Sequence, residues 1–264
     1  MNFNSPVIFG KTSASVGRLG IGSAYNAKAD VFEMAFERGC SYFVHDAAFG
    51  KGIGMTEAII RLCETGQREK LFIVAGLNWR LVPFVRRALY SFLKKNKLDY
   101  VDGLIIPWFN KEPAKKYFDL IQELKEKRVI RFAGITGHNR SLFPELAKRG
   151  LVDFFHTRYN AVHRGAETDV FEKLRSLPER PGVVSYTATC WRKLLTPRNI
   201  PAGEKMPAGS DCYRFVLTNP DIDVCMTGPR NRSEMEEALT ALDKGPLDSA
   251  ELAWMKRVGD HIYG

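Results

Sequence analysis

Apolar and polar positions alternate along this chain as short apolar runs, each followed by a longer amphipathic segment. Eight runs have the length of a buried strand, and each is followed by apolar residues at helical spacing. The expected strands cover Ser15–Gly22, Tyr42–Val44, Leu71–Ala75, Leu104–Ile106, Phe132–Thr136, Phe154–His156, Gly182–Tyr186 and Val224–Met226. Such alternation is typical of parallel strands joined by crossover helices.

The intervening segments predict helices, several of which carry cap residues. Asn231 or Ser233 is expected to cap the helix after the last strand, and Thr56 to cap the one after the second. The other expected helices pass through Val31–Phe36, Val82–Leu93, Ala114–Lys127, Ser141–Lys148, Asp169–Leu174 and Asp211–Leu217, with a tail helix over Ala250–His261. Eight such units favour a single-domain (β/α)₈ barrel over 1–264, with an extra C-terminal helix, rather than an open doubly wound sheet.

Length and composition agree with one large core. The 264 residues are 45% hydrophobic, and no apolar run reaches the roughly 18 residues that a bilayer span needs. The N-terminus has no basic region followed by an apolar one, so no secretory signal is expected. The five cysteines are scattered without a C-x-x-C pair. They indicate reduced thiols in a cytoplasmic protein, with no metal and no iron–sulfur cluster.

The formal net charge of +9 raises the question of a nucleic-acid partner. The basic residues are spread over the expected helices, and no zinc spacing, glycine-rich RNA motif or basic tail accompanies them. A solvated outer helical face therefore explains the charge, and neither nucleic acid nor membrane is expected as a partner. The excess is compatible with an anionic small-molecule ligand, bound by a monomer or homodimer.

In a (β/α)₈ barrel the active site lies at the carboxyl ends of the strands, so polar residues there are candidates. Arg158 can bind a carboxylate or phosphate through two parallel N–H bonds, and Tyr159 can supply a phenolic proton. The candidate catalytic residues are His45, Asp46, His138, His156, Arg158 and Tyr159. The candidate substrate-binding residues are Trp108, Asn110, Asn139 and Asn160.

Several candidates also have a structural alternative. His45 and Asp46 can form a solvated loop pair, and His138 with Asn139 can cap the helix that begins near Ser141. Tyr159 can serve packing alone. The spacing of the histidines is not a metal-ligand motif, so no metal site is predicted.

Phrases over nearly the whole chain resemble aldo-keto reductases in one consistent order. They are RLGIG, YFVHDAAFG followed by TEAI, LDYVDGLII, LKEKRVIRFAGIT, RYNAVHRG, VVSYTA, YRFVLTNPDIDVCMTGPRN and GPLDSAELAWM. The resemblance implies a (β/α)₈ barrel and NADP(H)-dependent carbonyl reduction by an Asp, Tyr, Lys and His set. The matching positions hold Val44, Phe49, Gly76 and Pro107, none of which can transfer a proton, so the usual reduction is not expected.

The cofactor positions implied by the resemblance are retained in part. The retained ones are Tyr186 against the nicotinamide, Thr187 near phosphate, and Gly228, Arg230 and Glu237 around the adenosine. Departures include His156 for a Gln, Thr136–Gly137 for the Ser–Asn pair that grips the carboxamide, and Ala238 for an Asn. Glu234 replaces a Gln where its charge would repel a 2′-phosphate, so NADP(H) binding is expected to be weakened or absent.

Three functions remain open on the sequence. The first is a repurposed enzyme that acts on an anionic small molecule without hydride transfer. The second is an oxidoreductase of unusual design that binds NADP(H) and uses another acid. The third is a non-catalytic binding protein on the same scaffold.

Overall fold

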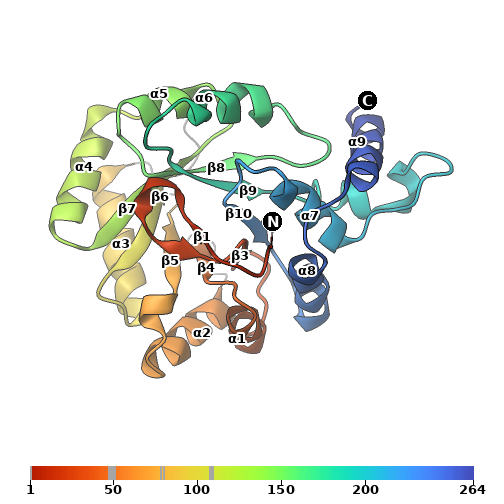
Figure 1. Cartoon of the computed structure of the whole chain (residues 1–264). Helices are drawn as coiled ribbons and strands as arrows, with labels where there is room; N and C mark the ends of the chain where they lie inside the picture. Colours follow the sequence, from red (N-terminus) through yellow and green to blue (C-terminus); the bar gives the residue numbers. More distant parts are fainter. Residues whose placement is uncertain (1, 47–51, 78, 80, 107–109) are drawn as a thin grey trace.

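Parallel strands close into a barrel in the order β10-β3-β4-β5-β6-β7-β8-β9 (Figure 1). The computed structural model describes residues 2–46, 52–77, 79, 81–106 and 110–264. The barrel strands are β3 (Leu19–Gly22), β4 (Tyr42–Asp46), β5 (Phe72–Gly76), β6 (Val101–Ile106), β7 (Ile130–Thr136), β8 (Phe154–Arg158), β9 (Gly182–Tyr186) and β10 (Val224–Thr227).

Helices surround the barrel, and the segment after each strand returns the chain to the start of the next (Figure 1). They are α1 (Ala29–Glu37), α2 (Ile53–Glu64), α3 (Val82–Asn96), α4 (Lys115–Glu126), α5 (Leu142–Lys148), α6 (Glu172–Arg175), α7 (Gly209–Thr218), α8 (Arg232–Lys244) and α9 (Ser249–Tyr263). Short turns of helix lie at Gly10–Thr12, Arg68–Lys70, Glu167–Phe171, Lys193–Leu195 and Pro197–Asn199. The predicted (β/α)₈ barrel with an additional C-terminal helix is thereby confirmed.

Two apolar cores stabilise this arrangement. The larger one lies between the sheet and the helices, and a smaller one fills the barrel interior with residues that alternate along each strand. Tyr42, Phe72 and Phe154 belong to the inner core, and Phe9 packs against all three with ring centroids 5.4–5.5 Å apart. Phe9 therefore closes the barrel at the amino ends of the strands.

Phe9 reaches this position because the chain begins with a hairpin. β1 (Val7–Ile8) pairs antiparallel with β2 (Ser15–Val16), and Figure 1 shows this hairpin lying across the barrel. The expected single strand Ser15–Gly22 is therefore wrong, because it is divided into β2 and β3. At Gly17 between them, the backbone N–H donates to Ser41 Oγ over 2.9 Å instead of continuing a strand ladder.

Two further expectations are corrected near the second barrel strand. β4 continues to Asp46, so His45 and Asp46 lie on the strand and point to opposite sides of the sheet. Thr56 lies inside α2 and does not cap it, because the helix begins after Gly52, whose φ of 97° suits glycine. The Thr56 hydroxyl instead makes a 2.8 Å hydrogen bond with His45 Nε2.

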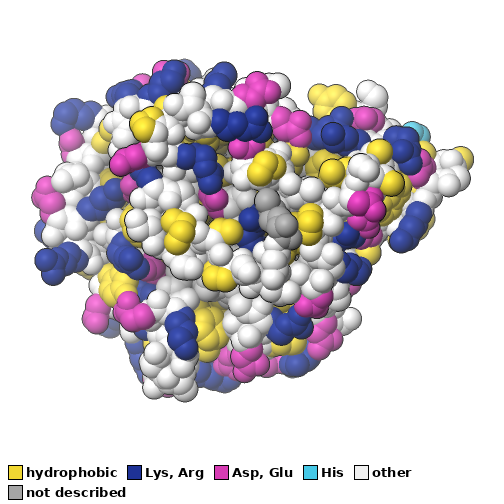
Figure 2. Space-filling view, in the orientation of Figure 1, with side chains coloured by type: hydrophobic (Ala, Val, Ile, Leu, Met, Phe, Trp, Pro, Cys, Tyr) yellow, Lys and Arg dark blue, Asp and Glu magenta, His cyan; other side chains and the backbone are white. Residues whose placement is uncertain are grey.

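The exposed charge is dispersed. On the face in Figure 2, Lys and Arg side chains are interspersed with Asp and Glu and form no single basic patch. Within the part of the chain that the structure describes, no helix is long and apolar enough to cross a membrane.

Candidate active site

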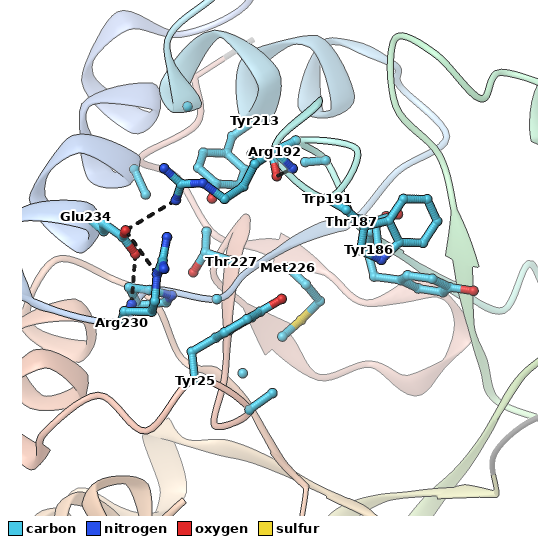
Figure 3. A pocket seen from close by; sticks show the side chains of 18 of the residues that line it. Tyr25, Tyr186, Thr187, Trp191, Arg192, Tyr213, Met226, Thr227, Arg230 and Glu234 are labelled. Carbon is cyan, nitrogen blue, oxygen red and sulfur yellow. Dashed lines mark hydrogen bonds and ion pairs between the residues drawn. The ribbon is translucent and has the colours of Figure 1, made fainter. Parts of the chain in front are cut away.

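A cavity of about 790 Å³ opens at the carboxyl ends of the strands and extends to the first turn of α8 (Figure 3). We call its inner part the floor, which is formed by Val44, Asp46, His156, Tyr186 and Met226. We call its other part the α8 end, whose charged lining residues are Arg192, Arg230, Glu234 and Glu237. The cavity thus joins the barrel interior to a helix N-terminus.

Strand periodicity explains the floor. On β4, Val44 and Asp46 follow Tyr42 at alternate positions, and on β8, His156 follows Phe154 in the same way. His156 lies beneath the cavity with Nε2 2.9 Å from the Tyr42 hydroxyl. Burial lowers the pKa of His156 from 6.5 to about 3, so the imidazole is neutral at physiological pH.

The roof of the cavity comes from the segment between β9 and α7. Cys190, Trp191 and Arg192 all have positive φ, at 49°, 50° and 68°. This conformation is unfavourable for residues with side chains, and it persists because the fully buried Cys190 and local backbone hydrogen bonds determine it. The consequence is that Trp191 and Arg192 both line the cavity.

The α8 end is built around one carboxylate. Asn231 caps α8 by accepting a 3.0 Å hydrogen bond from the Glu234 N–H, as one of the two cap predictions proposed. Glu234 in turn accepts from the Arg230 N–H at 2.9 Å and forms ion pairs with Arg230 Nε and Arg192 Nη1, each at 3.3 Å. Figure 3 shows both guanidinium groups directed toward Glu234.

Gly228 and Glu237 occupy defined positions in the same region. A Cβ on Gly228 would lie 2.6 Å from the Tyr25 ring, so glycine permits this aromatic ring to form one edge of the cavity. Glu237 Oε1 accepts a 2.8 Å hydrogen bond from the Ser210 N–H at the start of α7. Thr187 also lines the cavity, where its hydroxyl donates to the Tyr186 carbonyl.

Arg158 adjoins the cavity beside Trp191. It ends β8 at the next alternate position after His156, and its guanidinium carbon lies 5.7 Å from the centre of the Trp191 ring. Among the described residues it has no ion pair, and its buried Nε has no hydrogen-bond partner. Of the predicted catalytic residues, the structure therefore brings Asp46, His156 and Arg158 to this region.

Three other predicted residues lie away from the cavity. His45 is buried between sheet and helices against Phe92, and burial lowers its pKa to about 4. Tyr159 is also buried, and its hydroxyl donates to Glu167 Oε1 at 2.6 Å, while burial raises its pKa. Asn160 holds a loop by donating to the Thr187 carbonyl at 2.8 Å and accepting from backbone N–H groups.

Asn110, His138 and Asn139 form a separate exposed cluster. The His138 N–H donates to Asn110 Oδ1 at 2.9 Å, and Asn139 Nδ2 donates to the Asn110 carbonyl at 3.2 Å. Ser141 Oγ donates to Asn139 Oδ1 at 2.6 Å, just before α5. The predicted Trp108 lies outside the described residues, as do Phe49 and Pro107.

Sequence reasoning missed several residues that shape the cavity, namely Tyr25, Trp191, Arg192 and Tyr213. Within the described ranges, no group of three or more His, Cys, Asp or Glu side chains is arranged to hold a metal ion. The cavity therefore combines a floor of apolar, aromatic and titratable side chains with an ion-paired α8 end and a neighbouring guanidinium.

Comparisons with known proteins address the fold. No protein-family model matches the sequence, and no curated protein matches it. The holo form of the aldo-keto reductase AKR11C1 from Bacillus halodurans matches with a TM-score of 0.79 at 15% identity, over 96% of each chain. Its apo form gives a TM-score of 0.78 at 17% identity, over 96% of this chain and 95% of that one.

A thermostable aldo-keto reductase, Tm1743 in complex with the inhibitor epalrestat, matches with a TM-score of 0.74 at 19% identity. This match covers 96% of the present chain and 99% of the other. These similarities establish the fold: the chain has the aldo-keto reductase type of (β/α)₈ barrel. The resemblance inferred from sequence phrases is confirmed to that extent.

Proposed function

We propose that this protein is an atypical oxidoreductase that binds a nicotinamide dinucleotide in the cavity and an anionic small molecule beside Arg158. The observation that carries the proposal is the continuous cavity from the barrel floor to the first turn of α8. A dinucleotide needs an elongated site in which one end leaves room for a substrate beside the reactive ring. Ligands of (β/α)₈ barrels bind at the carboxyl ends of the strands, where this cavity lies. The aldo-keto reductase fold supports the same assignment.

The chemical character of the lining side chains suits a nicotinamide dinucleotide. Tyr186, Met226 and Val44 supply a flat, mainly apolar surface for the reactive ring, and Thr187 supplies a hydroxyl for the phosphates. The nicotinamide, when bound, would give or accept a hydride. Arg158 would orient an anionic substrate by paired N–H bonds, and His156 and Asp46 are the titratable groups at the floor.

We further propose that the usual carbonyl reduction does not occur. Val44 and Gly76 stand where the resemblance implies a carboxylate and an ammonium group, and neither side chain can tune or transfer a proton. Purified protein is therefore expected to show no oxidation of NADPH or NADH with simple aldehydes. Turnover of those aldehydes would contradict this part of the proposal.

Direct titration tests the binding step. Trp191 lines the cavity, so a bound dinucleotide should quench tryptophan fluorescence and raise the unfolding temperature by mass action. Trp191→Phe should lose most of the quenching while keeping the thermal shift. If neither signal appears at millimolar NADH or NADPH, the alternative applies: a barrel that binds an anionic molecule without hydride transfer, which Val44 and Gly76 also favour.

A further inference from the structure

The α8 end of the cavity already contains a carboxylate where two guanidinium groups meet. Glu234 forms 3.3 Å ion pairs with Arg192, from the segment after β9, and with Arg230, from the loop before α8. The Arg230 N–H adds a third contact to the same carboxylate at 2.9 Å. An internal anion therefore occupies the position that would attract a ligand's anion.

A second carboxylate completes the balance of charge. Glu237, one turn further along α8, lines the same end of the cavity and is held by the Ser210 N–H at 2.8 Å. Of the described residues that line this end, the charged ones are two arginines and two glutamates. The α8 end therefore has no net positive charge to offer a phosphate monoester, which carries close to two negative charges at neutral pH.

We propose that Glu234 makes the α8 end selective for a ribose with free hydroxyl groups, so that the protein binds NAD(H) in preference to NADP(H). This inference rests on the proposed function. The reactive ring must lie at the floor, beside Arg158 and His156, so the adenosine half extends to the α8 end.

The physical argument concerns hydrogen-bond roles. An ionised carboxylate only accepts hydrogen bonds, and ribose hydroxyls can donate to it without disturbing its two ion pairs. A 2′-phosphate would have to displace Glu234 from Arg192 and Arg230 or lie beside it, and both arrangements are unfavourable. We expect NADH to bind at least about tenfold more tightly than NADPH, a difference of about 1.4 kcal/mol.

The test compares the wild type with Glu234→Gln and a matched control, Glu236→Gln. Glutamine keeps the size of residue 234 and an acceptor for the Arg230 N–H but removes the charge. Glu236 lies on the same helix, does not line the cavity, and pairs only with Arg232 among the described residues, at 3.0 Å. Isothermal titration calorimetry is performed with NADH, NADPH, AMP and adenosine 2′,5′-bisphosphate, and thermal unfolding verifies that each variant is folded.

The expected result is a preference for NADH and for AMP in the wild type and in Glu236→Gln. In Glu234→Gln that preference should fall by at least about tenfold. Equal or tighter NADPH binding by the wild type would overturn the inference and leave the proposed function standing. An unchanged preference for NADH in Glu234→Gln would also overturn it, because the selectivity would then lie elsewhere.

The adenosine ligands separate the two proposals. If neither dinucleotide binds but AMP is preferred to the bisphosphate through Glu234, the nicotinamide function and the preference for NAD(H) fail, and only the selectivity of Glu234 for a free ribose hydroxyl is supported. If none of the four ligands binds to the wild type or to Glu234→Gln, both proposals are contradicted.

Discussion

The Tyr42 hydroxyl lies 2.9 Å from His156 Nε2, inside the barrel and directly beneath the cavity floor. The phenol is fully buried in the inner core, and this imidazole nitrogen is its one hydrogen-bond partner among the described residues. The phenol therefore donates and Nε2 accepts, which leaves the proton of the neutral imidazole on Nδ1. Tyr42 thus determines which tautomer His156 presents.

Tyr42→Phe is expected to destabilise the protein by about 1–3 kcal/mol, because it leaves His156 Nε2 buried without its donor. Urea denaturation measures this loss. Tyr100→Phe is the control, since its hydroxyl meets Glu69 near the surface at 3.1 Å, and its loss should cost less than about 0.5 kcal/mol. Equal effects of the two substitutions would show that the buried pair contributes nothing specific.

A second prediction for the same pair concerns tautomers. Nitrogen-15 NMR of the wild type should show the proton of His156 on Nδ1, and Tyr42→Phe should permit both tautomers. A wild-type spectrum with the proton on Nε2 would mean that the imidazole donates to the phenol oxygen, and Tyr42 would then have a different role.

Two buried histidines predict a pH dependence of stability. Burial lowers the pKa from 6.5 to about 3 for His156 and to about 4 for His45, so the unfolded chain binds protons that the folded chain does not. The stability that these two groups contribute is fully present above pH 6.5 and is lost progressively as the pH falls to about 4 for His45 and to about 3 for His156. The slope is at most about 1.4 kcal/mol per pH unit for each histidine.

Denaturation at several pH values between 4 and 7 tests this dependence. His156→Gln should reduce the slope, because glutamine can still accept from Tyr42 but does not titrate. An identical slope in wild type and His156→Gln would mean that His156 remains able to take up a proton when folded.

The barrel could be predicted from the sequence because each of its units repeats the same local signals. Short apolar runs specified strands, and the spacing of residues such as Met235, Leu239 and Leu242 specified a helix whose cap, Asn231, was among the predicted choices. The ends of the strands were predicted less accurately than their presence. The expected ends of β4 and β8 were each two residues short.

The strand ends that were predicted too short explain why only some of the candidate catalytic residues lie at the cavity. Once β4 extends to Asp46, alternation sends Asp46 to the cavity and His45 to the helix layer, where Thr56 and Phe92 surround it. Tyr159, the residue after β8, likewise enters the outer core. Because the expected strand ended two residues early, both side chains were assigned to a loop, and the alternation that places them on opposite sides of the sheet was not applied.

The roof of the cavity could not be predicted from local patterns. Non-glycine residues with positive φ are uncommon, and nothing in the sequence indicates that Cys190, Trp191 and Arg192 adopt this conformation. The ion pair between Arg192 and Glu234 joins segments 42 residues apart. Only the folded chain brings such groups together.

Gly228 provides a test of the cavity edge. Gly228→Ala would place a Cβ 2.6 Å from the Tyr25 ring, which is 56% exposed and can move aside. We expect a stability loss below about 1 kcal/mol but at least about threefold weaker dinucleotide binding, measured by calorimetry. Gly76→Ala is the control, because Gly76 does not line the cavity and a Cβ there meets its nearest atom at 3.7 Å. Similar binding losses in both variants would argue against a role for Tyr25.

Arg158 is the residue on which the anionic substrate class depends. A half-buried guanidinium without an ion pair among the described residues contributes little to stability, yet it can attract an anion next to the cavity. Arg158→Met should weaken the binding of small carboxylates and inorganic phosphate at least about tenfold, while changing the free energy of unfolding by less than about 1 kcal/mol. Trp191 fluorescence measures the binding, because its ring lies against Arg158.

Arg149→Met removes the same charge at the carboxyl end of α5, from a residue that does not line the cavity. Its pair with Glu112 is exposed, so neither binding nor stability should change appreciably. A loss of binding in Arg158→Met alone, with stability retained, would support a ligand contact. Parallel losses of binding and stability in Arg158→Met would instead assign the guanidinium a structural role. The variant would then lose anion binding because its folded structure is destabilised.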